Sequence, residues 1–184
     1  HFTVASTDSG QRFQLQFDGI FRNANIWVNG FFVGNLASGY VGDSYDISDY
    51  LFFNKDNVIA VRVDATQYEG WFYEGAGIYR HVWLKKAQPV HIENDGVFIS
   101  ASVEKNNAIV SVEATVENKE LVQQSCTVYS YITERNGKRI AQSKEQQLAL
   151  AVNAKGILKQ NLQVPNVHVW SLEDPYLYRV TTIV

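Results

Sequence analysis

The sequence contains no methionine and a single cysteine, Cys126. One cysteine excludes an internal disulfide and any metal site built from several cysteines. Cys126 alternates with Val128, Ser130 and Ile132 in a strand-like run, so we expect a small buried core residue rather than a reactive thiol. A natural chain begins with methionine, whereas this one begins at His1 in polar sequence. This start predicts a piece of a longer protein.

Long apolar runs and clusters of basic residues are also missing. No run reaches membrane-spanning length, and no signal peptide is visible, so we expect no membrane partner. The net charge is −3 and Lys85-Lys86 is the only basic pair of note, which argues against nucleic acid. The four histidines are too widely spaced to suggest a metal cluster, and we expect neither a metal nor a cofactor. They are His1, His81, His91 and His168.

Alternation of apolar and polar residues is what the sequence has in abundance. Phe13, Leu15 and Phe17 are predicted to share one face of a strand, and residues 59–63 and 110–116 alternate in the same way. The dipeptides Asn29-Gly30 and Asn136-Gly137 suit tight hairpin turns. Residues 146–152 have mixed propensity and predict a strand and turn rather than a helix. Many short strands with turn signals between them predict an all-β protein.

A change in composition at residues 85–89 predicts two units, 1–88 and 89–184. The aromatic-rich sequence ends there, and Pro89 interrupts strand pairing. The second unit has the length of an immunoglobulin-like β-sandwich of about 100 residues. The first unit is short for a jelly roll and is predicted to lack its opening strands.

Several motifs occur in an order that resembles a known family. They are FDGI (17–20), IWVNG (26–30), VG (33–34), GY (39–40), YDIS (45–48), NVIAVRVD (57–64), GAGIYRHVWL (75–84) and VWSLEDPYLY (169–178). The series resembles glycoside hydrolase family 2, which contains β-galactosidases, β-glucuronidases and β-mannosidases. The first seven resemble its N-terminal sugar-binding domain, which implies a galactose-binding-like jelly roll for the first unit. The last resembles its immunoglobulin-like second domain. Leu172 stands where that family usually has a proline.

The resemblance implies a non-catalytic N-terminal portion of a β-galactosidase-like glycosidase. Retaining glycosidases use two carboxyl groups roughly 5 Å apart. In the family both lie on a (β/α)8 barrel of about 250 residues, which this chain does not contain. We therefore assign no catalytic residue and expect the piece alone to be inactive. The implied partners are a carbohydrate and the barrel of the full-length enzyme. Whether the full-length enzyme also forms a homo-oligomer is left open by the sequence. A periplasmic or secreted enzyme is favoured over a cytoplasmic one.

The loop around residues 68–75 carries large rings and acids where a simple connection would be small and polar. Rings can stack on the apolar face of a sugar and carboxylates can accept bonds from its hydroxyls. We therefore predict a substrate-binding contribution from Glu69, Trp71, Tyr73 and Glu74. The alternative is that the rings pack against a neighbouring domain. Several family members have a substrate-contacting aspartate six residues before the Gly-Ile pair, a position that Trp71 occupies here.

Other interpretations remain at this point. The chain could be a self-sufficient carbohydrate-binding module, or an adhesion or scaffold protein. Asp43, Asp46 and Asp49 could be read as calcium ligands, although their spacing matches no known loop. Arg80 is expected to be an ion-pair partner. Trp170 is expected to cap the core of the second sandwich.

Overall fold

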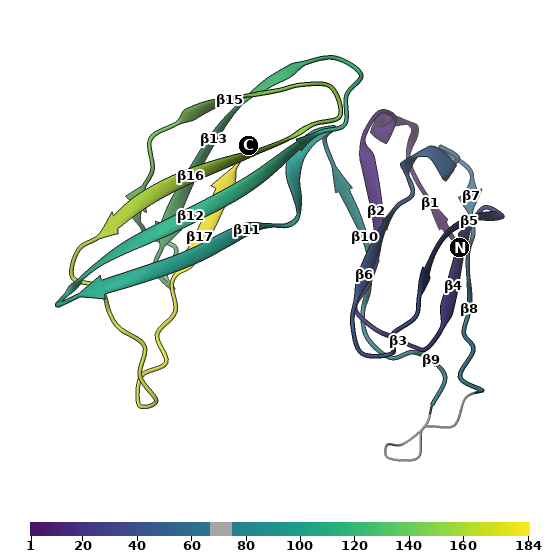
Figure 1. The fold of residues 1–184 in the computed structure, drawn as a ribbon, viewed down its shortest axis with the longest axis horizontal. Helices are drawn as coiled ribbons and strands as arrows, with labels where there is room; N and C mark the ends of the chain where they lie inside the picture. The colour runs from purple at the N-terminus through teal and green to yellow at the C-terminus, as the bar shows by residue number, and fades with distance from the viewer. Residues whose placement is uncertain (67–74) are drawn as a thin grey trace. The chain divides into compact units, whose positions relative to one another are not determined.

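The computed structural model describes residues 1–66 and 75–184 and is built almost entirely of β-strands (Figure 1). Two short 3-10 helices, η1 (Ser6–Asp8) and η2 (Ser48–Tyr50), are the only helices among these residues. Within the described chain, no helix has the length and apolarity to cross a membrane. The chain divides into two compact units, His1–Gln88 and Pro89–Val184. The predicted all-β class with two sandwiches is confirmed.

The first unit contains two three-stranded antiparallel sheets, ordered β10-β2-β6 and β5-β4-β8, and two small strand pairs, β1-β7 and β3-β9. Its strands are β1 (Phe2–Thr3), β2 (Arg12–Phe17), β3 (Ile20–Phe21), β4 (Ala24–Val28), β5 (Phe31–Leu36), β6 (Asp43–Asp46), β7 (Asp56–Asn57), β8 (Ile59–Arg62), β9 (Gly77–Ile78) and β10 (Val82–Ala87).

The core of the first unit lies between its sheets. Phe13, Leu15 and Phe17 of β2 are buried, as the alternation predicts, and pack with Ile26 and Val28 of β4. The β4–β5 hairpin turns at Asn29-Gly30, whose positive φ angles of 50° and 86° are those that this dipeptide favours.

The three aspartates considered as calcium ligands have other partners. Arg12 donates to Asp46 at 2.6 Å and lies 3.5 Å from Asp49, while Asp43 accepts a bond from the Ser44 amide. Within residues 1–66 and 75–184, no group of three or more His, Cys, Asp or Glu side chains could hold a metal ion.

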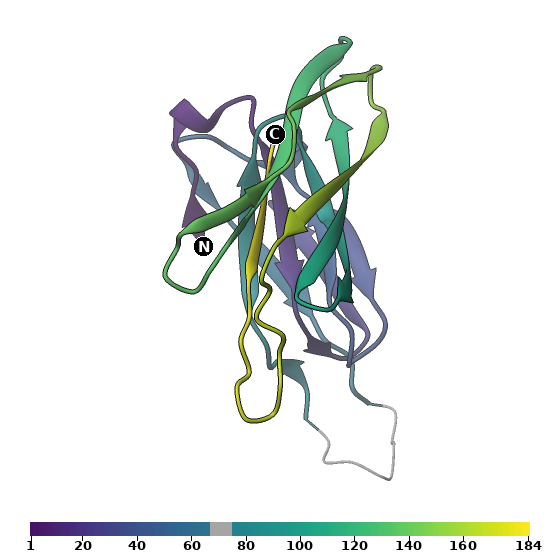
Figure 2. The same cartoon turned by 90° about the vertical axis from the view of Figure 1, so that its left-hand side faces the viewer.

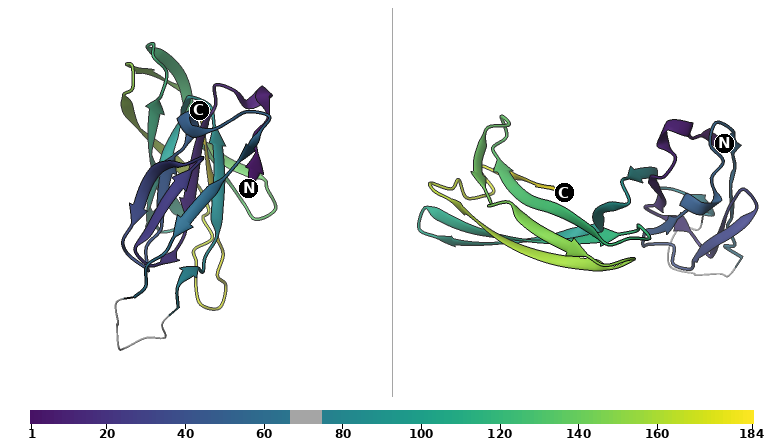
Figure 3. Two further views of the ribbon diagram at one scale, coloured as in Figure 1. Left: turned by 90° about the vertical axis from the view of Figure 1, so that its right-hand side faces the viewer. Right: turned by 90° about the horizontal axis from the view of Figure 1, so that it is seen from above.

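The second unit consists of two packed sheets, which can be followed in the turned views of Figure 2 and Figure 3. One sheet has the order β11-β12-β16; in the other, β14, β15 and β17 all pair with β13. The strands are β11 (Val90–Glu104), β12 (Asn107–Asn118), β13 (Gln124–Thr133), β14 (Arg139–Gln142), β15 (Gln146–Leu150), β16 (Lys155–Val164) and β17 (Arg179–Ile183).

Inward residues of β12, β13 and β16 form the core of this unit. Val110, Val112 and Val116 are buried, as the alternation predicts. Residues 146–150 form strand β15, so the strand prediction there is confirmed. Cys126 is half-buried against the cluster that contains Val128 and Leu150, and burial raises the pKa of its thiol. A raised pKa leaves little thiolate, which agrees with an unreactive core residue.

The prediction for Trp170 is wrong, because its side chain is 52% exposed. Two hydrogen bonds between Ser171 and Asp174 form a local turn directly after Trp170. The Ser171 amide donates to the Asp174 carbonyl, and the Asp174 amide donates to the Ser171 hydroxyl. His168 pairs with Asp174 at 2.8 Å and stacks on the ring of Tyr176. These contacts hold residues 168–176 in place while the Trp170 side chain remains outside the core.

Candidate functional site

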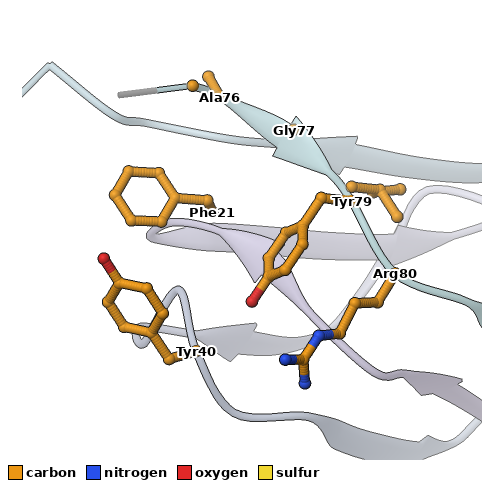
Figure 4. A pocket seen from close by; sticks show the side chains of 8 residues that line it. Phe21, Tyr40, Ala76, Gly77, Tyr79 and Arg80 are labelled. Carbon is orange, nitrogen blue, oxygen red and sulfur yellow. The ribbon is translucent and has the colours of Figure 1, made fainter. Parts of the chain in front are cut away.

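A cavity of about 490 Å³ opens at the end of the first unit that carries β3 and β9. Its described lining consists of Phe21, Tyr40, Gly75, Ala76, Gly77, Ile78, Tyr79 and Arg80. Figure 4 shows the rings of Phe21, Tyr40 and Tyr79 around one space, with the Arg80 side chain extending beside Tyr79. Three aromatic rings and one guanidinium group therefore surround the cavity.

Strand pairing brings the two sides of this cavity together. Phe21 of β3 lies opposite Gly77 of β9, and Ile20 lies opposite Ile78. Ile20 is fully buried and fixes β3 in the core, whereas Ile78 is exposed. The short β3–β9 ladder thus anchors the segment that presents Tyr79 and Arg80.

Aromatic contacts position the remaining wall. The ring of Tyr40, which lies between β5 and β6, meets Phe21 edge to face with ring centroids 5.7 Å apart. The guanidinium of Arg80 lies 5.4 Å from the centroid of the Tyr79 ring, in the range of a cation–π contact. Tyr40 and Tyr79 remain 59% and 49% exposed, so much of their surface is open to a ligand.

Two glycines allow the rings to lie this close to the backbone. A Cβ atom at Gly19 would be 2.9 Å from Cζ of Tyr79, and one at Gly39 would be 2.3 Å from Cδ2 of Phe21. Any side chain at either position would displace a wall of the cavity. The sequence analysis named these glycines only as members of the FDGI and GY motifs, and it missed their proximity to aromatic rings.

The chemistry of the cavity suits binding rather than bond cleavage. Flat rings can stack on an apolar ligand face, and a guanidinium can donate several hydrogen bonds. None of the eight described lining residues carries a carboxyl group. Glycosidic bond hydrolysis of the usual kind needs two carboxyl groups, so this lining does not form a hydrolytic centre by itself.

The predicted substrate-binding residues Glu69, Trp71, Tyr73 and Glu74 lie outside the described residues. The described chain resumes at Gly75, which lines the cavity. The sequence analysis did not select Phe21, Tyr40 or Tyr79, and it considered Arg80 only as an ion-pair partner. The GAGIYR motif was a usable signal, since its glycines and ring precede a strand.

A second polar cluster lies where β2 ends and β10 begins. The indole of Trp83 and the amide of Gln16 each donate a 2.8 Å hydrogen bond to the carboxylate of Asp18. These bonds, that of Trp83 above all, hold the pKa of Asp18 below its usual value. His81 lies 3.8 Å from the same carboxylate and close to the Trp83 ring. The contacts tie β10 to the turn before β3 and thereby support the cavity.

Family models match the whole length of both units. Residues 1–88 match the sugar binding domain of glycosyl hydrolases family 2, and residues 90–184 match a second model described as glycosyl hydrolases family 2.

Individual relatives give the same result. A β-galactosidase of Bacteroides ovatus, BoGH2A, is 34% identical over 183 residues, which are 98% of this chain and 21% of that protein. A putative β-glucuronidase of Formosa agariphila is 31% identical over 98% of this chain and 17% of its own length. The chain thus spans about a fifth of the length of these curated relatives.

Solved structures share the fold closely. A family 2 member from Bacteroides cellulosilyticus superposes with a TM-score of 0.94 at 36% identity, over 98% of this chain and 25% of that one. A β-glucuronidase of Bacteroides uniformis superposes with a TM-score of 0.89 at 27% identity, over 98% of this chain and 23% of that one.

Proposed function

This chain belongs to glycosyl hydrolase family 2, and we propose that it is the non-catalytic portion of a β-galactosidase-like glycosidase. Residues 1–88 act as its partial jelly-roll sugar-binding domain and residues 89–184 as its immunoglobulin-like domain. The two support a separate catalytic barrel. The observation that carries this proposal is the aromatic cavity of the first unit, which lies in the part that matches a sugar binding domain.

The cavity contributes one wall of the carbohydrate pocket. The rings of Tyr40 and Tyr79 offer exposed faces on which a sugar ring can stack. Glu69, Trp71, Tyr73 and Glu74 immediately precede the described lining residue Gly75 in sequence and add further rings and acids. The catalytic carboxylates come from the barrel, because the described lining has none.

Binding by the chain alone is weak in this proposal. An open cavity offers only a few stacking and hydrogen-bonding contacts, and the ligand must still lose its rotational and translational freedom. The pocket becomes concave when the barrel supplies the opposite wall. A homo-oligomer of the full-length enzyme is compatible with this arrangement.

The test compares the 184-residue chain with the full-length polypeptide on aryl β-galactosides, β-glucuronides and β-mannosides. We expect hydrolysis by the full-length protein only, and affinities of the short chain for simple sugars no tighter than about millimolar. Hydrolysis by the short chain would contradict the division of labour. A full-length protein without glycosidase activity, together with tight glycan binding by the short chain, would favour a self-sufficient carbohydrate-binding module.

A further inference from the structure

The outer face of the sheet β5-β4-β8 in the first unit carries a pair of aromatic rings. Trp27 of β4 lies opposite Phe32 of β5 and Ala60 of β8. Ile26 and Val28, the neighbours of this Trp on β4, are fully buried, so its ring points away from the core. The Trp27 and Phe32 rings meet edge to face, with centroids 5.7 Å apart and an interplanar angle of 63°. They therefore form a corner on the outside of the sheet.

A β-bulge places Phe32 in this corner. The register of β4 and β5 shifts between Ile26 and Trp27, which makes Val33 the extra residue of β5. Val33 packs against the core, and Phe32 takes the position opposite Trp27. Bulges re-aim side chains, and they are frequent next to active sites as well as at sheet edges. Burial does not account for this arrangement, because it leaves Phe32 55% exposed.

Polar side chains form the next row of the same face. Asn25 of β4 lies opposite Asn35 of β5 and Arg62 of β8. The Asn35 amide donates to the side-chain oxygen of Asn25 at 3.1 Å, which orients both amides. Among the described residues, none accepts a hydrogen bond from the NH2 group of Asn25 or from the guanidinium of Arg62. Both groups can therefore donate to a ligand.

A neutral saccharide chain matches this combination of groups. Aromatic rings can stack on the apolar face of a sugar, while amide and guanidinium groups donate to its hydroxyls. The three strands span about 10 Å, which is long enough for more than one sugar ring. The small side chain of Ala60 leaves the surface open on the side of Trp27 away from Phe32. An acidic sugar is disfavoured, because the charge of Asp64 interacts with that of Arg62 and offsets it.

We propose that the outer face of β5-β4-β8 is a second saccharide-binding site, which holds a neutral glycan chain on Trp27 and Phe32. None of the described residues that line the cavity of the first unit belongs to this face. Two rings and a few donors give weak binding, because little of the ligand surface is buried. Such a site raises the effective concentration of a polymeric glycan near the protein without taking part in bond cleavage.

An NMR titration of the 184-residue chain tests the contact with Trp27. The probes are soluble β-linked oligosaccharides of galactose, mannose and glucose. We expect the resonance of the Trp27 indole N–H to shift with at least one of them. Trp83 of the same unit is the internal control, because it is 47% exposed but its indole donates to Asp18. Its resonance should not move.

Two outcomes of this titration would overturn the proposal. One is a Trp27 resonance that stays in place with all three probes. The other is a Trp27 resonance that shifts with protein concentration in the absence of saccharide, which would assign the face to a second copy of the chain.

Two adjacent phenylalanines provide a matched pair of variants. Phe31 and Phe32 are 54% and 55% exposed, but the ring of Phe31 stacks on Tyr50 instead of meeting Trp27. Phe32→Ala should weaken oligosaccharide binding in the same titration by about three- to tenfold, the range expected for an aromatic contact. Phe31→Ala should leave the affinity unchanged. Equal losses from the two variants would contradict the proposal.

The full-length polypeptide separates this proposal from the proposed function. On a soluble polymer of the sugar that it accepts, Phe32→Ala should raise KM at least about threefold. Neither kcat nor the kinetics on the aryl β-glycoside should change, because a short substrate does not reach the second site. An unchanged KM on the polymer would overturn the proposal. If no glycoside is hydrolysed while the Trp27 resonance responds to oligosaccharides, the enzyme assignment is wrong and the second site stands.

Discussion

The hydroxyl of Tyr79 donates a 2.7 Å hydrogen bond to the backbone carbonyl of Gly39. This bond joins the segment after β9 to the loop before β6, two parts of the chain separated by 40 residues. It fixes two walls of the candidate sugar cavity relative to each other, because Gly39 is followed by Tyr40 and lies against the ring of Phe21. The geometry of the cavity thus depends on a glycine that is not among its described lining residues.

The first prediction concerns that glycine. Gly39→Ala places a Cβ 2.3 Å from Cδ2 of Phe21, so the ring or the loop has to move. We expect a loss of about 1–3 kcal/mol in the free energy of unfolding, the usual cost of overpacking. Urea denaturation of the 184-residue chain measures this loss in the free energy of unfolding. Gly75→Ala is the matched control, because a Cβ there meets no atom within 4 Å; an equal effect of both substitutions would show that the Phe21 contact is not the cause.

The second prediction replaces the expectation of a buried Trp170. Since this side chain is 52% exposed, Trp170→Ala should change the free energy of unfolding of the 184-residue chain by no more than about 0.5 kcal/mol, as at other surface positions. Leu162→Ala is the contrasting variant. Leu162 is only 1% exposed and its truncation should cost about 2–5 kcal/mol. A large loss from Trp170→Ala in thermal denaturation would mean that this ring is buried in solution.

The third prediction concerns acid denaturation. Burial would raise the pKa of Asp46, but hydrogen bonds from Ser48 and Arg12 outweigh it and hold this pKa below its usual value. A carboxyl whose pKa is lower in the folded state stabilises the protein fully above its unfolded pKa of about 3.9. That stabilisation is lost as the pH falls through the lower folded pKa. Asp46→Asn should therefore destabilise the chain at neutral pH, and progressively less as the pH falls below the unfolded carboxyl pKa of about 3.9.

Asp49→Asn is the matched control for this prediction. Asp49 faces the same Arg12, but at 3.5 Å and with its side chain 82% exposed, so solvent screens the interaction. Stability is measured by urea denaturation between pH 2 and 7 (a range chosen around the ordinary carboxyl pKa of about 3.9). If both variants lost the same stability at neutral pH, the hydrogen bonds around Asp46 would not be the source of the effect.

Local patterns predicted most of the fold. Alternation identified the buried faces of β2 and β12, and Asn29-Gly30 located a hairpin because few other dipeptides accept two positive φ angles. The exposure of Trp170 could not be predicted in the same way. Its local sequence shows that it lies next to turn residues, but whether a ring faces inward depends on hydrogen bonds such as those between Ser171 and Asp174.

The described lining of the candidate site was not predicted, for a similar reason. The loop composition pointed to Glu69, Trp71, Tyr73 and Glu74, which lie outside the described residues, whereas the described lining comes from Phe21, Tyr40 and residues 75–80. Phe21 and Tyr40 reach it from β3 and from the loop before β6, through strand pairing and an edge-to-face contact. Such long-range contacts leave no periodic signal in the sequence around either residue.

The last prediction concerns the sugar pocket of the full-length enzyme. Trp71→Ala removes a ring that can stack on a sugar, and Glu74→Gln removes the charge of a hydrogen-bond acceptor. Tyr40→Ala removes the exposed wall of the described cavity. Each variant should lower kcat/KM for the accepted aryl β-glycosides on the order of tenfold, which corresponds to about 1.4 kcal/mol of transition-state stabilisation. We expect little change in Tm for each variant; for Tyr40→Ala the reason is that an exposed side chain contributes little to folding.

Phe52→Ala serves as the control for these variants. Phe52 is an aromatic residue of the same unit with comparable exposure, 49%, but it precedes β7 and does not line the cavity. The kcat/KM of the Phe52→Ala enzyme should equal that of the unmutated enzyme. If Trp71→Ala and Glu74→Gln left the kinetics intact and lowered the Tm instead, the loop would be packed against a neighbouring domain. If only Tyr40→Ala lowered kcat/KM, the sugar contact would belong to the described cavity and not to the loop before it, because that cavity would then supply the stacking surface by itself.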